Sequence, residues 1–218
     1  MRLYLLRHGE VSSHWGDVPI TADAERRAFE VGRGFGEREE EAVLVLTGET
    51  RRAIDTGSHL ASGVTEAGGA VIGPRVAFAL RNPDLYLAGT RVNMVSSAEA
   101  MAAQVEDMSA EQVLTHDFFP EFFASPDRIG WWLTHHSPPG EDAAAIAARV
   151  RAFAASLIDP ISGDPDVVVA VTHSPLLRAA GLDLLGRDIG EPPWVSGLLI
   201  EVGDRGKLSA EVLTGDQR

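Results

Sequence analysis

Three short runs of apolar residues, each followed by a polar turn, constrain the fold of this chain most strongly. They occupy residues 3–6, 42–46 and 167–171. A short apolar run bounded by turn residues is typical of a strand that is buried on both faces. Such strands are found in parallel sheets that are covered by helices on both sides. The three runs therefore predict the centre of an α/β sheet.

Helical patterns separate these runs. Thr21 is an expected N-cap, and the acidic residues Asp23 and Glu25 in the following turn suit the helix dipole. Ser174 and Pro175 form a second strong helix start. We expect helices at residues 22–38, 51–61, 140–158 and 175–185, a loop at 63–69, short strands at 71–72 and 76–78, and a terminal hairpin at 196–202 and 208–213. This order predicts a three-layer α/β sandwich, with a mostly parallel sheet and helices on both faces.

The middle of the chain, residues 81–139, has a different character. It is rich in Met, Phe and Trp at helical spacing and shows no strand pattern. We interpret it as a helical cap inserted into a single domain that spans residues 1–218. Its aromatic and methionine side chains form either a core or a lid that lines a substrate pocket.

Composition limits the classes of function. The formal net charge is −13 and there is no cysteine, which argues against nucleic-acid binding and excludes disulfides and thiolate chemistry. No apolar run approaches the roughly 20 residues of a membrane span, and we expect a soluble cytoplasmic protein. The overall negative charge repels anionic ligands, so an anion site has to be a tight local cluster of Arg and His.

Such a cluster is predicted where the three apolar runs end. Arg7 and His8 follow the first run, Arg52 lies in the first turn of the helix after the second, and His173 follows the third. The carboxyl ends of parallel strands share one edge of a sheet, where ligands bind. Arginines bind phosphate oxygens bidentately, helix amides add donors, and a neutral imidazole can attack phosphorus. The combination fits a phosphoryl group.

Five segments in this order resemble the histidine phosphatase superfamily, branch 1, which has the phosphoglycerate mutase-like fold. Arg7-His8-Gly9 matches its signature. The other four are residues 20–28 (with Ala24 and Arg27 departing from the pattern), residues 52–56 (with Asp55 in place of Gln), Gly140-Glu141-Asp142, and residues 171–174 (with Ser174 in place of Gly). The matches extend over nearly the whole chain.

The resemblance implies a mechanism without metal or cofactor. His8 would carry the phosphoryl group, while Arg7, Arg52 and His173 would bind its oxygens. A carboxylic acid would protonate the leaving oxygen, and we predict Asp84, with Glu141 as the alternative.

One more residue of the predicted site is open to two interpretations. His14 is either a further phosphate ligand or an ordinary loop residue.

The expected activity is hydrolysis of a small phosphomonoester, and phosphate or sulfate would fit the site. A mutase-type isomerase and a non-catalytic phosphate-binding regulatory module are the alternatives. The identity of the substrate and a homodimeric state are left open by the sequence.

Overall fold

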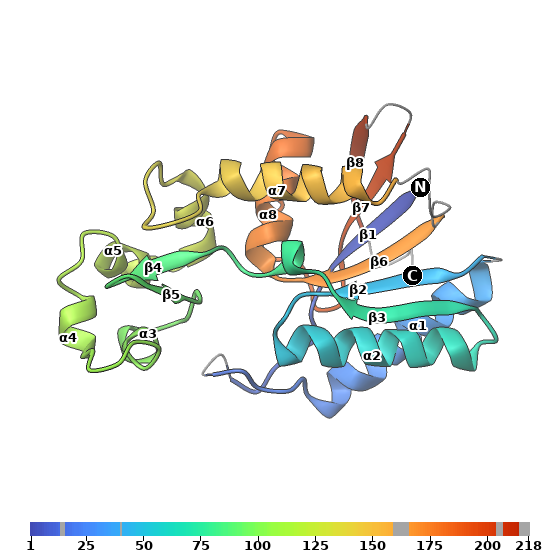
Figure 1. The fold of residues 1–218 in the computed structure, drawn as a ribbon, viewed down its shortest axis with the longest axis horizontal. Coiled ribbons are helices and arrows are strands. Elements are labelled where there is room, and N and C mark those ends of the chain that lie inside the picture. The colour runs from blue at the N-terminus through green and yellow to red at the C-terminus, as the bar shows by residue number, and fades with distance from the viewer. Residues whose placement is uncertain (14–15, 40, 159–165, 204–206, 214–218) are drawn as a thin grey trace.

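A six-stranded sheet forms the centre of the molecule, in the order β3-β2-β6-β1-β7-β8 (Figure 1). The computed structural model describes residues 1–13, 16–39, 41–158, 166–203 and 207–213. The first four strands in this order are parallel, whereas β7 runs antiparallel to both of its neighbours, β1 and β8. The strands are β1 (Arg2–Arg7), β2 (Val43–Thr47), β3 (Val71–Val76), β6 (Val167–Thr172), β7 (Gly197–Val202) and β8 (Leu208–Val212). The predicted mostly parallel sheet is confirmed.

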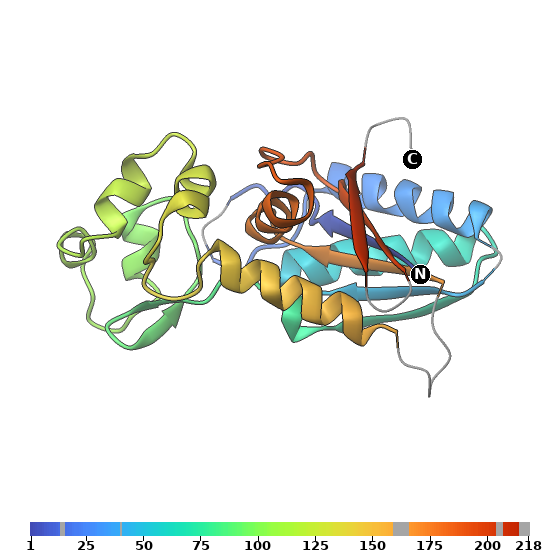
Figure 2. The ribbon, with the colours of Figure 1, turned by 90° about the horizontal axis from the view of Figure 1, so that it is seen from above.

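Helices cover both faces of this sheet. Helices α1 (Ala22–Arg38) and α2 (Arg51–Glu66) lie on one face, and α7 (Ala143–Ser156) and α8 (Ser174–Leu185) lie on the other (Figures 1 and 2). Alternate strand residues enter two separate apolar clusters: Leu5 joins one and Leu6 joins the other. Burial on both faces explains why the strands are continuous apolar runs.

Helices α1 and α2 pack backbone against backbone. A Cβ atom at Gly32 would lie 2.1 Å from the carbonyl oxygen of Leu60, and one at Gly63 would lie 2.0 Å from that of Phe29. The expected loop at residues 63–69 was wrong, because α2 continues to Glu66. Gly63 is a close-packing position inside this helix and does not end it.

The cap begins after a short 3-10 helix, η1 (Phe78–Leu80), and contains both strands and helices. Its elements are β4 (Leu85–Leu87), β5 (Thr90–Val92), α3 (Ala98–Ala102), α4 (Ala110–Val113), α5 (Phe119–Ala124) and α6 (Arg128–Thr134). The prediction of a cap without strands was wrong, since β4 and β5 form an antiparallel hairpin. Its two-residue turn has positive φ at Ala88 (49°) and Gly89 (79°). Two-residue hairpin turns with positive φ at both positions favour Asn, Asp or Gly, so Ala88 does not indicate a hairpin.

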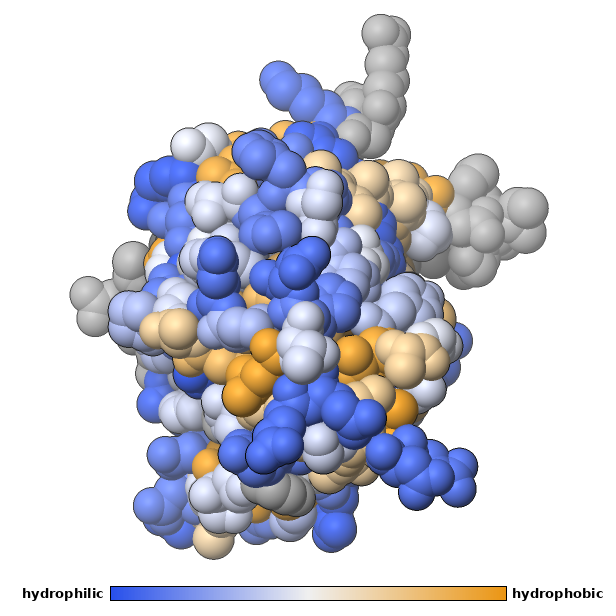
Figure 3. Space-filling view, turned by 90° about the vertical axis from the view of Figure 1, so that its left-hand side faces the viewer, coloured by the Kyte–Doolittle hydropathy of each residue, from blue (hydrophilic) through white to orange (hydrophobic). Residues whose placement is uncertain are grey.

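The aromatic residues of the cap mainly form its core. Trp132, Phe119 and Phe122 are almost completely buried and belong to the same apolar cluster as the α7 and α8 face of the sheet. Figure 3 looks onto the cap end of the molecule and shows a mixed surface with apolar side chains between hydrophilic ones. Leu114 and Tyr86 are exposed large apolar residues of the cap. None of the described helices has the length and apolar character that a membrane span needs.

The α1–α2 contact gives a first testable prediction. Gly32→Ala is expected to lower the free energy of unfolding by about 1–3 kcal/mol, because the new methyl group overpacks the contact with Leu60. Gly34→Ala is the matched control. Its Cβ would meet only the flexible end of Arg38, and alanine stabilises a helix interior by about 0.5–1 kcal/mol. Urea unfolding of both variants measures the difference, and equal effects would contradict the packing argument.

Candidate active site

A cavity of about 410 Å³ lies at the C-terminal edge of the sheet and brings together Arg7, His8, Arg52 and His173. These four residues come from three separate parts of the chain, as the sequence predicted. The remaining lining residues come from the cap and from α8 with the loop after it: Asn82, Met94, Val95, Ser96, Pro126, Asp127, Arg128, Ile129, Ser174, Pro175, Arg178 and Glu191. The cavity therefore joins a cationic end to a wall contributed by the cap.

Arg7 is the last residue of β1, and its side chain is only 10% exposed. Its guanidinium carbon lies 3.3 Å from the ring centroid of Trp194, and Nη1 donates a hydrogen bond of 2.7 Å to the carbonyl of Pro192. Nη2 forms an ion pair of 2.6 Å with Glu191. Burial lowers the pKa of Arg7 to about 10, although Glu191 opposes the shift. The group therefore stays cationic at neutral pH.

The hydrogen bonds of His8 define its tautomer. Nδ1 lies 2.7 Å from the carbonyl oxygen of Gly9. A carbonyl only accepts, so Nδ1 carries the proton and Nε2 carries the lone pair. Consistently, Nε of Arg52 donates a hydrogen bond of 3.2 Å to Nε2. His8 lines the cavity. An imidazole with an unprotonated ring nitrogen is the form that attacks phosphorus.

Gly9 and Thr56 hold this histidine in place. A Cβ atom at Gly9 would lie 2.9 Å from that of Ala24, so glycine is required for the close approach to α1. The amide of Gly9 donates a hydrogen bond of 2.9 Å to Thr56 Oγ1, which in turn donates to the carbonyl of Arg52 at 2.6 Å. The first turn of α2 is thereby connected to the backbone next to His8.

Arg52 lies in that first turn, at the edge where β2 ends. Burial lowers the pKa of its guanidinium, and Asp17 opposes the shift from 3.9 Å away. The backbone amide of the neighbouring Arg51 donates to Asp17 at 2.8 Å, while the side chain of Arg51 is exposed and pairs with Asp55. Of the two arginines, Arg52 is the one that lines the cavity.

His173 is 2% exposed, and its ring centroid lies 5.2 Å from that of His8. Both ring nitrogens are buried and have no hydrogen-bond partner among the described residues. Burial, reinforced by Arg52, moves the pKa of His173 well below its ordinary value, so the ring is neutral. Buried polar atoms normally have partners, and these two line a cavity. The arrangement points to a polar ligand at this position.

The start of α8 differs from the prediction by one residue. His173 is the N-cap, with extended backbone (φ −126°, ψ 156°) and no side-chain capping bond, and α8 begins at Ser174. Ser174 Oγ instead donates a hydrogen bond of 2.5 Å to Glu191. The N-terminal amides of α8 thus start at the residue that contributes the second imidazole, which suits an anion there.

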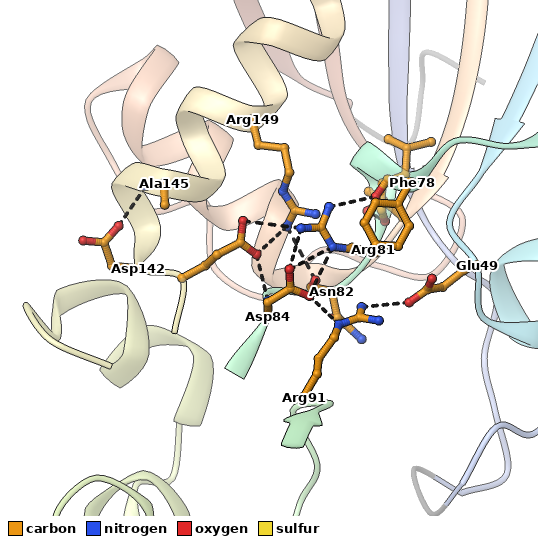
Figure 4. Close-up of polar contacts among 12 residues, drawn as sticks. Glu49, Phe78, Arg81, Asn82, Asp84, Arg91, Asp142, Ala145 and Arg149 are labelled. Atoms are coloured by element: carbon orange, nitrogen blue, oxygen red, sulfur yellow. Dashed lines mark hydrogen bonds and ion pairs between the residues drawn. The ribbon is translucent and has the colours of Figure 1, made fainter. Parts of the chain in front are cut away.

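Asp84, the predicted general acid, and Glu141, its alternative, belong to a network of ion pairs with arginines. Figure 4 shows Asp84 between Arg81 and Arg91. Asp84 accepts hydrogen bonds from Arg81 (2.5 Å) and from Arg91. Burial opposes it, but these bonds lower the pKa of Asp84. Glu141 accepts from the amide of Asp84 at 2.8 Å and pairs with Arg149 at 3.3 Å. Neither carboxylate is among the residues that line the cavity, so the acid role of Asp84 stays a prediction.

Several polar residues of the cavity were not predicted, among them Asn82, Arg178 and Glu191. Asn82, which is 5% exposed, lines the cavity two positions before Asp84. Arg178 and Glu191 lie on α8 and in the loop after it, in segments without a recognisable motif. Only the position of Asn82, directly after η1, is close to a residue that the sequence singled out. His14 lies outside the described residues.

Arg178 connects the cap to the body of the molecule beside the cavity. It is 2% exposed and donates to both oxygens of Asp127 at 2.7 Å and to Asp188 at 2.6 and 3.0 Å. The hydrogen bonds from Arg178 lower the pKa of Asp127 to about 2. Asp127 is therefore a permanent carboxylate.

Across the described chain, no group of three or more His, Cys, Asp or Glu side chains is arranged to hold a metal ion.

The fold and the site together define a phosphoglycerate mutase-like α/β protein with two histidines and two arginines at its ligand edge. The family model of the histidine phosphatase superfamily (branch 1) matches residues 101–199. The resemblance predicted from the motifs is confirmed. A search among curated protein sequences gave no match.

Solved structures extend the likeness to nearly the whole chain. The mycobacterial glucosyl-3-phosphoglycerate phosphatase complexed with VO3 aligns with a TM-score of 0.60 and 22% identity, covering 98% of this chain and 97% of that one. A phosphoglycerate mutase from Bacillus anthracis aligns with a TM-score of 0.56 and 18% identity, covering 98% of this chain and 92% of that one. A third structure is a phosphoserine phosphatase mutant from Entamoeba histolytica in complex with phosphoserine. It aligns with a TM-score of 0.58 and 13% identity, covering 99% of this chain and 98% of that one. At these identities the comparison establishes the fold.

The buried neutral His173 predicts a pH dependence of stability. In the unfolded chain its imidazole binds a proton as the pH falls through about 6.5, whereas in the folded protein it stays neutral. Stability contributed by this residue is therefore present above that pH and lost below it, by up to about 1.4 kcal/mol per pH unit. His173→Asn is expected to show a shallower loss of unfolding free energy between about pH 6.5 and 5. Urea unfolding at several pH values measures this slope, and identical slopes would contradict the prediction.

Proposed function

We propose that this protein is a phosphatase that hydrolyses a small phosphomonoester through a phosphohistidine at His8. The observation that carries the proposal is the tautomer of His8, whose Nε2 holds a lone pair beside Arg52 in a cavity. The likeness to the histidine phosphatase superfamily, and to two structures described as phosphatases, supports this reaction class.

In the proposed reaction, the phosphoryl group occupies the cationic end of the cavity. Arg7, Arg52 and the α8 amides neutralise its oxygens and the charge that develops in the transition state. Nε2 of His8 forms a bond to phosphorus as the ester oxygen leaves. Water then attacks phosphorus, the bond to His8 breaks, and phosphate is released. His173 donates a hydrogen bond to a phosphoryl oxygen, which supplies the partner that its buried ring lacks.

The leaving oxygen needs a proton donor that reaches the cavity. Asp84 and Glu141 are both held by arginines outside the cavity lining. Arg81 and Arg91 bind Asp84 outside the cavity lining, so a ligand in the cavity does not compete for them. They keep Asp84 a carboxylate, which argues against it as a proton donor.

His8→Ala tests the nucleophile. Wild type is expected to release phosphate from a panel of phosphomonoesters, and His8→Ala is expected to release none above background because no phosphohistidine can form. Acid-quenched wild type should carry an acid-labile phosphoryl label that His8→Ala lacks. Release that survives in His8→Ala would overturn the mechanism. Transfer of the label to a second position of the substrate would identify a mutase, and binding of phosphate without turnover would identify a regulatory module.

Arg52→Ala tests the electrostatic part of the site. Loss of one preorganised donor to the transition state is expected to lower kcat by about 10²–10³-fold. Arg51→Ala is the matched control, because Arg51 is exposed, pairs with Asp55 and does not line the cavity. Steady-state kinetics with the best substrate of the panel distinguishes the two. Equal effects of both substitutions would contradict the assigned role of Arg52.

A further inference from the structure

Glu191 places a carboxylate directly on the cationic end of the cavity. One of its oxygens lies 2.6 Å from Nη2 of Arg7, and the other accepts the 2.5 Å hydrogen bond from Ser174 Oγ. Nη1 of Arg178 is 3.9 Å away. The carboxylate thus bridges the end of β1 and the start of α8, the elements that carry the first arginine and the second histidine of the site.

A phosphoryl group bound at this end of the cavity would use the same atoms of Arg7 that Glu191 contacts. Nη2 of Arg7 belongs to the guanidinium that the proposed function assigns to a phosphoryl oxygen. An oxygen bound there would lie against Glu191, and two anions at one guanidinium repel each other. A like charge at short range favours the protonated form of a carboxyl group. Binding of a phosphomonoester therefore favours a carboxylic acid at Glu191, next to the ester.

The other charged groups around Glu191 leave it as the proton donor of the cavity. Asp127, the second carboxylate in the described lining, is held by two hydrogen bonds from Arg178, which lower its pKa to about 2. Asp188 also binds Arg178. The side chain of Glu191 is 49% exposed and lines the cavity, so both solvent and a bound ester can reach it.

We propose that Glu191 is the acid–base residue of this site, an assignment that rests on the proposed function. In the first step Nε2 of His8 bonds to phosphorus and the bond to the ester oxygen breaks. That oxygen keeps the electron pair and takes the proton of the Glu191 carboxyl, which leaves an alcohol. In the second step a water oxygen bonds to phosphorus, its proton passes to the Glu191 carboxylate, and the bond to His8 breaks.

The test compares two esters under single-turnover conditions. Hexyl phosphate has a poor leaving group that needs protonation, whereas 4-nitrophenyl phosphate has a good one that does not. Glu191→Gln is expected to slow alcohol release from hexyl phosphate by about 10²–10⁴-fold, the contribution of general acid catalysis. Formation of nitrophenolate should change little. Glu191→Asp, which keeps a carboxyl group, should recover part of the rate with hexyl phosphate.

The matched control is a glutamate at the other end of β1, the strand that ends in Arg7. Glu39 pairs with Arg2 of β1 at 2.6 Å, and Glu39→Gln is expected to leave the rates with both esters unchanged. Glu191→Gln should also remove the alkaline limb of the pH profile with hexyl phosphate. A merely structural role of Glu191 would instead slow both esters equally.

Three results would overturn the proposal. They are equal losses with both esters in Glu191→Gln, an unchanged rate with hexyl phosphate, or a selective loss in Asp84→Asn or Glu141→Gln instead. Failure of the proposed function looks different: wild type would release nothing from either ester, or His8→Ala would retain release. A wild type that is active, with an inactive His8→Ala and an unaffected Glu191→Gln, would overturn the acid assignment alone.

Discussion

The parallel pairing of β1 with β6 is the interaction on which the site depends. In this register Arg7 lies opposite Thr172, so the residues that follow the two strands are His8 and His173. The amide of His8 donates to the carbonyl of Thr172 at 2.9 Å, which extends the ladder to the first imidazole. A slip of one residue would turn every side chain of β1 to the opposite face. Both faces of β1 pack against apolar clusters, so such a slip would disrupt close packing on each face. The core thereby holds the two histidines at their distance.

Internal counter-ions and burial explain how an acidic protein with a net charge of −13 maintains a cationic site. Arg7 is paired with Glu191 and stacked on Trp194, and Arg52 has Asp17 at 3.9 Å. Removing a charge from water is costly unless it is paired. The ligand-free site therefore contains its own anions. In our proposal the nearest of them, Glu191, becomes the proton donor when a phosphoryl group takes its place on Arg7.

Features that follow from local patterns or from the general rules of parallel sheets could be predicted, and those that depend on individual side-chain contacts or unusual turn residues could not. The apolar runs, Thr21 as N-cap and the convergence of Arg7, His8, Arg52 and His173 follow from periodicity and from the shared edge of a parallel sheet. The β4–β5 hairpin was missed because each strand has three residues and Ala88 occupies a positive-φ position.

The positions of the carboxylates around the site could not be predicted either. Asp84 is close in sequence to the cavity residue Asn82, but its side chain is captured by Arg81 and Arg91, a contact with no sequence signature. Glu191 enters the cavity from a loop without periodicity. The ion pairs of Arg178 with Asp127 and Asp188 hold the start of α6 against α8, and the cavity wall that faces a leaving group depends on this contact. The helix that has His173 at its N-terminus therefore also holds the cap. In our proposal, this one element links the binding of the phosphoryl group to the wall that faces the rest of the substrate.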